Sequence, residues 1–245
     1  MYPRLRKQST PTPRSANQCA SCIGRSLNIC RPLNDKQLTE LLALGGPKSW
    51  RKRDILFRAG DPISDFFKIT KGVVAVSKTL EDGRRQIVAL RIAGDCVGYL
   101  HTDGRYTFEG HAITDVEACT FSRHRFDDLA WQYPELAAAT AEALAKAHRQ
   151  ANQSIMVMGQ LRSQERVAYF LAEIHALYES RFGEMESISL HMNRTEIADY
   201  TGLTIETISR TIAKLKKRGL IALLEGNGDA ILNLQGLQQF GKFER

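Results

Sequence analysis

The sequence contains no long hydrophobic run and no segment that resembles a secretory leader. No apolar stretch approaches the roughly 18 residues that a membrane-spanning helix needs. Arg4, Arg6 and Lys7 stand near the start, but no apolar stretch follows them. These absences lead us to expect a cytoplasmic protein without membrane contact, in which cysteines stay reduced and serve as free thiols or as metal ligands.

Acidic residues are missing from two segments. No Asp or Glu precedes Asp35, and none lies between Lys146 and Gln164. The whole chain has 34 Lys and Arg against 27 Asp and Glu, a net charge of +7. Such a surplus favours a polyanionic partner only weakly, because it often marks no more than a solvated surface. Residues 1 to about 17, which are basic and contain prolines, are predicted to form a disordered arm.

Disulfides and structural metals are not needed for folding. The composition is that of an ordinary globular chain, with 43% hydrophobic and 25% charged residues. A chain of 245 residues buries a sufficient core without covalent or metal cross-links. The five cysteines therefore require another explanation.

Short apolar runs separated by glycine and aspartate occupy the region from Trp50 to about Arg125. This pattern predicts a compact antiparallel β-barrel or roll, with a hairpin turn at residues 81–84. A short helix is predicted just before it. Asn34 and Gln37 suit a capping box at its start, and the Gly-Gly-Pro sequence at residues 45–47 ends it.

An alanine-rich helix of about 27 residues is predicted after Tyr133 and Pro134. Apolar and small residues recur along it at intervals of three and four, as in a coiled-coil seam. The alternative is a helix that packs only on its own β-roll, but the length and the narrow stripe favour contact between two subunits. The predicted dimerisation residues are Ala141, Leu144, His148, Ala151, Ile155 and Met158.

The C-terminal third predicts helix, helix, turn, helix and a β pair at residues 221–224 and 231–234, as in a winged helix-turn-helix. We therefore predict an α+β fold, with an N-terminal antiparallel β-roll, a long dimerisation helix and a C-terminal winged helix-turn-helix. The predicted units are a flexible arm with a cysteine loop (1–34), the β-roll (35–133), the dimerisation helix (134–160) and the DNA-binding domain (161–245).

The helix-turn-helix is defined by its caps. Asn193 and Glu196 have capping-box spacing, Gly202 ends the first helix, and Thr204 is placed to cap the second. The spacing of four apolar residues of the second helix predicts that they face inward: Ile205, Ile208, Ile212 and Leu215. A rotation of about 100° per residue then places Glu206, Ser209, Arg210, Ala213 and Lys217 on the outward face.

That outward face suits the major groove of DNA. Arg210 matches the acceptors of guanine, Glu206 matches the cytosine amino group, and Ser209 serves either role. A solvated helix face is the alternative, but an acid facing a polyanion is unfavourable unless it contacts a base specifically. Lys214, Lys216, Lys217 and Arg218 are expected at or near phosphate. The predicted DNA-contacting residues are Thr204, Glu206, Thr207, Ser209, Arg210, Lys214 and Lys217.

Three cysteines fall within twelve residues, at Cys19, Cys22 and Cys30, with Cys119 far along the chain and Cys96 left over. A tight pair, a third ligand on the same loop and a remote fourth is a common arrangement for an iron–sulfur cluster. Zinc accepts the same four sulfurs in tetrahedral geometry. The spacing alone leaves both metals open.

The segment Leu203–Arg210 resembles the recognition element of the CRP/FNR superfamily of transcription regulators, in its FNR and FixK branches. The β-roll segments at residues 60–61, 67–72 and 92–98 resemble the same superfamily, whose roll is of the cyclic-nucleotide-binding type. The resemblance implies a homodimeric activator of genes for low-oxygen or anaerobic metabolism, nitrogen fixation included. It also implies a TTGAT…ATCAA-type palindromic operator and contact with RNA polymerase through residues 81–85.

Members that bind cyclic AMP carry a Gly-Glu step and an Arg-Ser or Arg-Thr pair. Here no Glu follows Gly98, and Arg105 is followed by Tyr106. A phosphate without this cradle is poorly held, so we expect no cyclic nucleotide. The chain also lacks a nucleotide loop or a nucleophile–base pair, so we expect no enzymatic activity.

In FNR-type oxygen sensors an N-terminal cysteine cluster and one β-roll cysteine hold a [4Fe–4S] cluster. The resemblance implies the same role for Cys19, Cys22, Cys30 and Cys119, although the Cys22–Cys30 gap is longer than in the best-known members. The rival within this fold is a regulator that uses zinc or thiol redox chemistry. Cys96 is expected to be a small buried core residue. Ala151 stands where such sensors can carry an acid, which predicts that the cluster-free form dimerises more readily than theirs.

Overall fold

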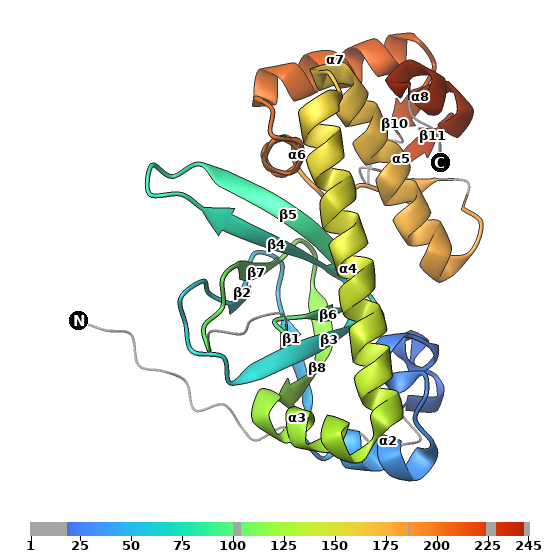
Figure 1. Cartoon of the computed structure of the whole chain (residues 1–245). Coiled ribbons are helices and arrows are strands. Elements are labelled where there is room, and N and C mark those ends of the chain that lie inside the picture. The colour runs from blue at the N-terminus through green and yellow to red at the C-terminus, as the bar shows by residue number, and fades with distance from the viewer. Residues whose placement is uncertain (1–18, 100–103, 186, 224–228, 243–245) are drawn as a thin grey trace.

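The computed structural model describes residues 19–99, 104–185, 187–223 and 229–242. Within these ranges a β-roll, a long helix and a C-terminal helical domain follow one another along the chain (Figure 1). The long helix, α4, runs nearly the full height of the molecule, with the roll along one side of it and the C-terminal domain around its upper part. The architecture confirms the predicted α+β class.

The chain enters the structure through two short 3-10 turns, η1 (Ile23–Ser26) and η2 (Asn28–Cys30), and the helix α2 (Asp35–Leu42). The predicted capping box is present. The Gln37 backbone N–H donates to Asn34 Oδ1 and the Asn34 N–H donates to Gln37 Oε1, both at 3.0 Å. Residues 19–34 form the cysteine loop, of which Cys19, Ile29, Cys30 and Leu33 are buried.

The β-roll consists of two four-stranded antiparallel sheets, as the alternation of apolar runs and turns predicts. In each sheet, strands distant in sequence are neighbours, which brings Cys119 next to Pro47 of the first strand and Lys68 of the third. The first sheet has the order β1 (Pro47–Trp50), β8 (Val116–Ser122), β3 (Asp65–Lys71) and β6 (Cys96–Val97). The second has the order β2 (Ile55–Phe57), β7 (Glu109–Ala112), β4 (Val73–Thr79) and β5 (Arg85–Ile92).

Gly72 joins β3 to β4 and has a φ of +87°. A Cβ atom at this position would lie 2.2 Å from the Asp115 carbonyl oxygen. Both the backbone conformation and the close approach therefore require glycine.

Two helices follow the roll: α3 (Arg123–Gln132) and α4 (Pro134–Gln160). The bounds of α4 match those of the predicted long helix. Pro134 stands at the start of α4, where its missing N–H costs no hydrogen bond. Along its 27 residues α4 buries only Leu136, Ala139, Thr140 and Val157.

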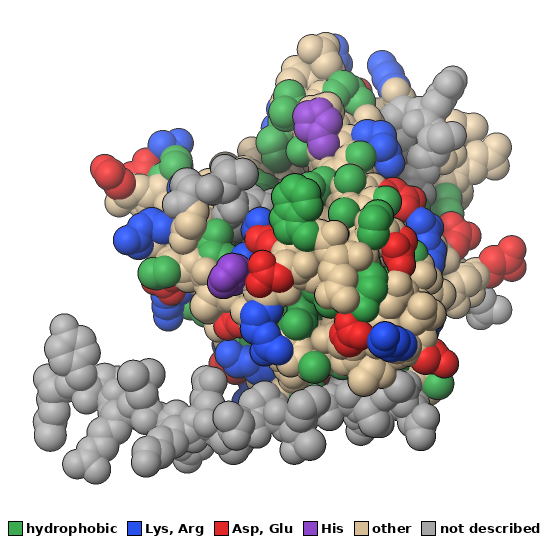
Figure 2. All heavy atoms as spheres, turned by 60° about the horizontal axis from the view of Figure 1, so that its bottom comes forward, with side chains coloured by type: hydrophobic (Ala, Val, Ile, Leu, Met, Phe, Trp, Pro, Cys, Tyr) green, Lys and Arg blue, Asp and Glu red, His purple; other side chains and the backbone are tan. Residues whose placement is uncertain are grey.

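The surface at the lower end of the molecule in Figure 1, which is turned forward in Figure 2, has acidic, basic and apolar side chains side by side.

The C-terminal domain contains four helices and a small sheet within the described residues. The predicted β pair is part of a three-stranded sheet of order β10 (Ile221–Leu223), β11 (Asp229–Leu232) and β9 (Ile188–Ser189). Leu234, predicted as the last residue of a strand, begins a helix instead. The reason is Asn233, whose side chain accepts the Gly236 N–H at 2.9 Å and caps that helix. The elements are α5 (Ser163–Phe182), β9 (Ile188–Ser189), α6 (Arg194–Thr201), α7 (Ile205–Lys217), β10 (Ile221–Leu223), β11 (Asp229–Leu232) and α8 (Leu234–Gly241).

The roll and the C-terminal domain share one hydrophobic core. Ile87 and Leu90 of β5 belong to the same buried cluster as Phe170 of α5, Ile197 of α6 and Leu237 of α8. No helix among the described residues is long and apolar enough to cross a membrane.

Candidate DNA-binding surface and cysteine pocket

Side-chain caps start α6 and α7, and a glycine ends α6. Asn193 Oδ1 accepts the Glu196 N–H at 2.9 Å, and Glu196 Oε2 accepts the Asn193 N–H at 2.7 Å, so the predicted capping box is confirmed. Gly202 ends α6 in the left-handed conformation, with a φ of 66°. Thr204 Oγ1 then accepts the Thr207 N–H at 3.3 Å and starts α7.

The inner face of α7 is mostly as predicted. Ile208, Ile212 and Leu215 are buried and hold the helix on the domain core. The prediction was wrong for Ile205, which is 45% exposed. Ile205 is the first residue of α7 and lies beyond the edge of the core, and the buried arc includes Thr211 instead.

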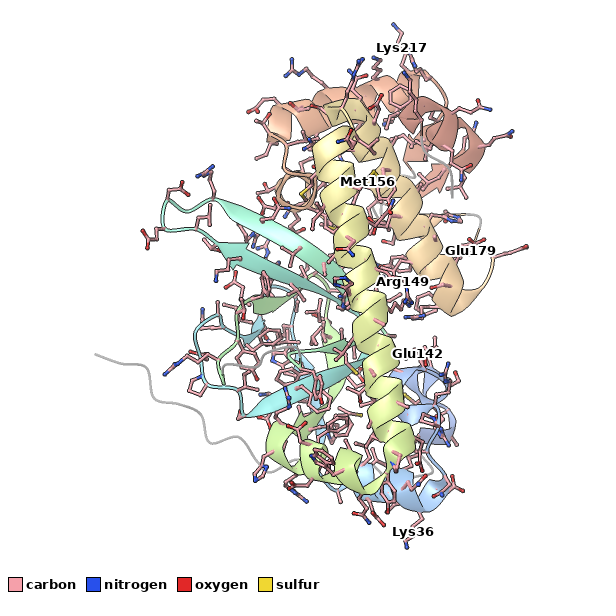
Figure 3. All side chains as sticks on the ribbon, in the orientation of Figure 1. Lys36, Glu142, Arg149, Met156, Glu179 and Lys217 are labelled. Carbon is pink, nitrogen blue, oxygen red and sulfur yellow. The ribbon has the colours of Figure 1, made fainter. Side chains whose placement is uncertain are left out.

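The outer face of α7 carries the predicted contact residues. Glu206, Ser209 and Arg210 are exposed, and Lys217 points away from the molecule at the far end of the helix (Figure 3). Thr207 is partly buried, with its hydroxyl 3.1 Å from that of Thr204.

Lys214 is exposed but already has partners within the chain. Its Nζ donates to Gln164 Oε1 at 2.6 Å and lies 5.9 Å from the centroid of the Phe240 ring. Lys217 is exposed as well, and no hydrogen bond within the described residues holds its side chain. Lys217 is therefore better placed than Lys214 to reach a phosphate.

Glu206 is held in its ionised form. A hydrogen bond from its own backbone N–H, then one from the Thr204 hydroxyl and the charge of Arg210, keep the pKa of Glu206 below its usual range. One turn later, Arg210 Nε donates to the Glu206 carbonyl oxygen at 3.4 Å. The face therefore presents a carboxylate acceptor beside a guanidinium donor, which is the pair needed to distinguish cytosine from guanine.

The comparisons with known proteins cover both domains. Residues 47–133 match the model of the cyclic nucleotide-binding domain, and residues 165–240 match that of the Crp-like helix-turn-helix domain. The chain is 33% identical over 208 residues to the nitrogen fixation regulation protein FixK of Bradyrhizobium diazoefficiens, covering 85% of this chain and 87% of that protein. The chain belongs to the CRP/FNR family of transcription regulators.

Two further relatives support this membership. The transcriptional activator protein FnrL of Cereibacter sphaeroides is 30% identical over 228 residues, with 90% of each chain covered. The solved structure of FixK2 from Bradyrhizobium japonicum superposes with a TM-score of 0.72 at 29% identity, covering 79% of this chain and 95% of that one. This CRP/FNR regulator is thus a DNA-binding protein of FixK type, and its family consists of regulators rather than enzymes.

The four cysteines predicted as ligands come together at one end of the roll. Cys19, Cys30 and Cys119 are buried in the same hydrophobic cluster. Cys22 is partly buried, and its N–H donates to the Cys19 carbonyl oxygen at 3.0 Å. We call this region the cysteine pocket: Cys19, Cys22, Cys30, Cys96 and Cys119. No group of three or more His, Cys, Asp or Glu side chains in the described ranges is already arranged to hold a metal ion.

Cys96, the cysteine left over by the sequence, belongs to the cysteine pocket as well. It is partly buried and packs against the cluster that contains Cys30 and Cys119. Burial raises the pKa of Cys96 to about 12, although the charge of Lys68 acts in the opposite direction. Burial also raises the pKa of Cys30.

Sequence reasoning missed the two cations of the cysteine pocket. Lys68 of β3 is only 2% exposed. Arg25 donates to the carbonyl oxygens of Cys30 at 2.5 Å and Leu33 at 2.7 Å, and so fixes the turn that carries Cys30. A thiol donor set beside two cations fits a thiolate-ligated, negatively charged group. No motif could reveal Lys68, because only the strand register brings it to the cysteines.

The predicted dimerisation seam is largely uncovered in the single chain. Ala141, His148, Ala151 and Ile155 are exposed, and Ile155 reaches 70%. Leu144 and Met158 are partly buried. A groove of about 630 Å³ runs between α4, α5 and the β5–β6 side of the roll and includes five of the six seam residues.

Proposed function

We propose that this CRP/FNR regulator is a homodimeric, oxygen-responsive activator that holds a [4Fe–4S] cluster through Cys19, Cys22, Cys30 and Cys119. The observation that carries the proposal is the cysteine pocket, in which these thiols lie beside a buried lysine. The cluster would supply an oxygen-labile group with net negative charge. The chain's own residues hold the loop, bind DNA and form the dimer.

The cysteine loop is coupled directly to α4. Arg31, which follows Cys30, forms an ion pair of 2.6 Å with Glu142 of α4, and Gln37 of α2 donates to Glu135 at the start of the same helix. Figure 3 shows Glu142 on the lower part of α4. A change in the fold of the loop therefore reaches the dimerisation helix through contacts of this chain. Loss of the bound group shifts the population away from the productive dimer.

The exposed seam of α4 supports association with a second copy. A helix of this length that leaves small and apolar residues exposed at heptad spacing is typical of a subunit interface. Two copies related by a two-fold axis place their α7 helices in successive major grooves, about one helical turn apart. The operator is then a palindrome of the TTGAT…ATCAA type, with Glu206, Ser209 and Arg210 as the base-contacting residues.

The proposed role is activation of genes for low-oxygen metabolism. One relative is named a nitrogen fixation regulation protein, and this suggests nitrogen fixation among the controlled processes. The hairpin at residues 81–85 has an exposed turn at 81–84, shaped by Asp82, whose carboxylate pairs with Arg84 at 2.7 Å. This hairpin is the proposed contact with RNA polymerase.

We propose that the roll binds no cyclic nucleotide. Tyr106 stands where nucleotide-binding members carry Ser or Thr. Its side chain is buried in the roll and packs on Phe57, with the ring centroids 4.6 Å apart.

Anaerobic purification tests the proposal. We expect a brown protein with iron and sulfide in nearly equal amounts, whose footprint on the palindrome is lost in air. A colourless protein that contains zinc without sulfide would instead support the rival regulator with a zinc site. A metal-free protein whose DNA binding follows thiol oxidation would support thiol redox sensing.

A further inference from the structure

Lys68 lies in the centre of a row of residues that crosses three strands. In the strand register Lys68 of β3 pairs with Cys96 of β6 on one side and with Cys119 of β8 on the other. Side chains of directly paired residues project from the same face of a sheet. The ammonium-bearing side chain therefore lies between two thiols on one face.

The ammonium group of Lys68 is buried, and its hydrogen-bond partners in the described part of the chain are neutral. Its Nζ donates to the carbonyl oxygen of Leu27 at 2.7 Å and to that of Gly94 at 3.3 Å. Among the residues that the structure describes, no carboxylate forms an ion pair with it. A buried charge without a counter-charge is costly, so a lysine in this position requires an anionic partner to be favourable.

The cysteine loop wraps closely around this lysine. A Cβ atom on Gly24 would lie 2.9 Å from Lys68 Cε, and Leu27, the acceptor of the shorter hydrogen bond, lies between Cys22 and Cys30. Lys68 thus anchors the segment that joins two of the proposed ligands. Arg25, the other cation, is partly exposed and is already bonded to the carbonyl oxygens of Cys30 and Leu33.

We propose that Lys68 is the counter-charge and positioning residue of a thiolate–metal group in the cysteine pocket. The inference rests on the proposed metal site but not on which metal occupies it. A divalent metal or a [4Fe–4S] cluster with four thiolates carries net negative charge, and ligand binding releases the thiol protons. In the loaded pocket, Lys68 balances part of this charge while it holds Leu27.

Two substitutions separate the charge of Lys68 from its hydrogen bond. Lys68→Met removes both, whereas Lys68→Gln removes the charge and keeps an N–H donor. Lys71→Met is the matched control, because Lys71 is an exposed lysine at the end of the same strand. Each full-length protein is titrated anaerobically with Co²⁺ against a chelator, and iron and sulfide are measured after reconstitution.

We expect Lys68→Met and Lys68→Gln to bind Co²⁺ about tenfold or more weakly than the unsubstituted chain, as is typical when a residue supporting the ligands is lost. Lys71→Met is expected to bind as the unsubstituted chain does. Thermal unfolding of the metal-free proteins supplies the second measurement. Because Lys68→Met removes an uncompensated charge, its metal-free form is expected to be at least as stable as the unsubstituted chain.

The outcomes separate the two proposals. Failure of the unsubstituted chain to take up either Co²⁺ or iron would overturn the proposed metal site itself. Normal uptake by that chain and equal affinity in Lys68→Met would overturn the role of Lys68 alone. Normal affinity in Lys68→Gln would show that the hydrogen bond and not the charge matters. Parallel loss of metal affinity and metal-free stability in Lys68→Met would reduce Lys68 to a packing residue.

Discussion

Arg181 of the DNA-binding domain donates through Nη2 to Asp95 Oδ1 of the roll at 2.7 Å, and through Nε to the Ala93 carbonyl oxygen at 3.2 Å. The side chains of Arg181 and Asp95 are only 6% and 14% exposed. In the same turn, the carbonyl oxygen of Gly94 accepts hydrogen bonds from Lys68 Nζ and from the side-chain amide of Asn28 in the cysteine loop. Residues 92–95 are thus contacted from the cysteine pocket on one side and from α5 on the other.

Removal of Arg181 should be strongly destabilising. Arg181→Met leaves the Asp95 carboxylate buried without its partner, and such a loss typically costs about 3–5 kcal/mol. Urea unfolding measures the change. The exposed pair of Arg84 and Asp82, with side chains 78% and 52% exposed, supplies the control. Arg84→Met should leave the free energy of unfolding nearly unchanged, because a solvent-exposed ion pair contributes little to stability. Equal effects of the two substitutions would contradict a buried interdomain pair.

The two types of contact on α7 should respond differently to sequence and salt. Arg210→Ala is expected to cost about 1–3 kcal/mol of binding free energy and to relax preference at one base pair of each half-site. Lys217→Ala should weaken binding to all sequences alike and reduce the salt slope by about one. Binding isotherms on the palindrome and on single-base variants, at several salt concentrations, distinguish them. A uniform loss for Arg210→Ala would contradict direct base readout.

The seam of α4 should tolerate an acid poorly. In a dimer, Ala151→Asp places two carboxylates near the two-fold axis, and like charges brought together at an interface are strongly unfavourable. We expect the dimer dissociation constant to rise about tenfold or more in sedimentation measurements. Gln153→Asp, also exposed but on the opposite side of α4, is the control and should leave association unchanged. The metal-free chain itself is expected to dimerise at micromolar concentration, and a clean monomer there would refute this.

Stability should fall in mildly acidic solution because of His111. This histidine is buried, its Nε2 has no hydrogen-bond partner among the described residues, and burial, followed by the charge of Arg85, lowers its pKa. The unfolded chain binds a proton near the ordinary pKa of about 6.5, whereas the folded chain does not. Stability is therefore present above that pH and falls as the pH drops below it, by up to about 1.4 kcal/mol per unit. His111→Asn should flatten this slope, with exposed His124→Gln as the matched control.

Local chemistry made most of the fold predictable. Asn34, Asn193, Gly202 and Thr204 cap or end helices through contacts with residues a few positions away, so their roles are written in short segments of sequence. The error at Leu234 had a local cause, the cap that Asn233 forms with Gly236, whereas the error at Ile205 arose where tertiary structure decides. Ile205 fits the apolar spacing of α7 but lies past the edge of the core.

The cysteine pocket was only half visible in the sequence. The spacing of Cys19, Cys22 and Cys30 indicated a ligand loop by itself. The neighbours of Cys119 did not follow from spacing, because they depend on how β8, β3 and β6 pair. Lys68 and Cys96 are about 50 and 23 residues from Cys119 along the chain, yet Lys68 pairs directly with both cysteines.

The hydrophobic core shared by the roll and the C-terminal domain has a thermodynamic consequence. Since Ile87 and Leu90 of the roll are buried among side chains of α5, α6 and α8, neither domain can unfold without exposing apolar surface of the other. The single chain should therefore melt as one cooperative unit, with one calorimetric endotherm whose calorimetric and van't Hoff enthalpies agree. Any reorientation of α7 relative to the roll must then proceed by a concerted repacking of this core and not by free swinging about a hinge.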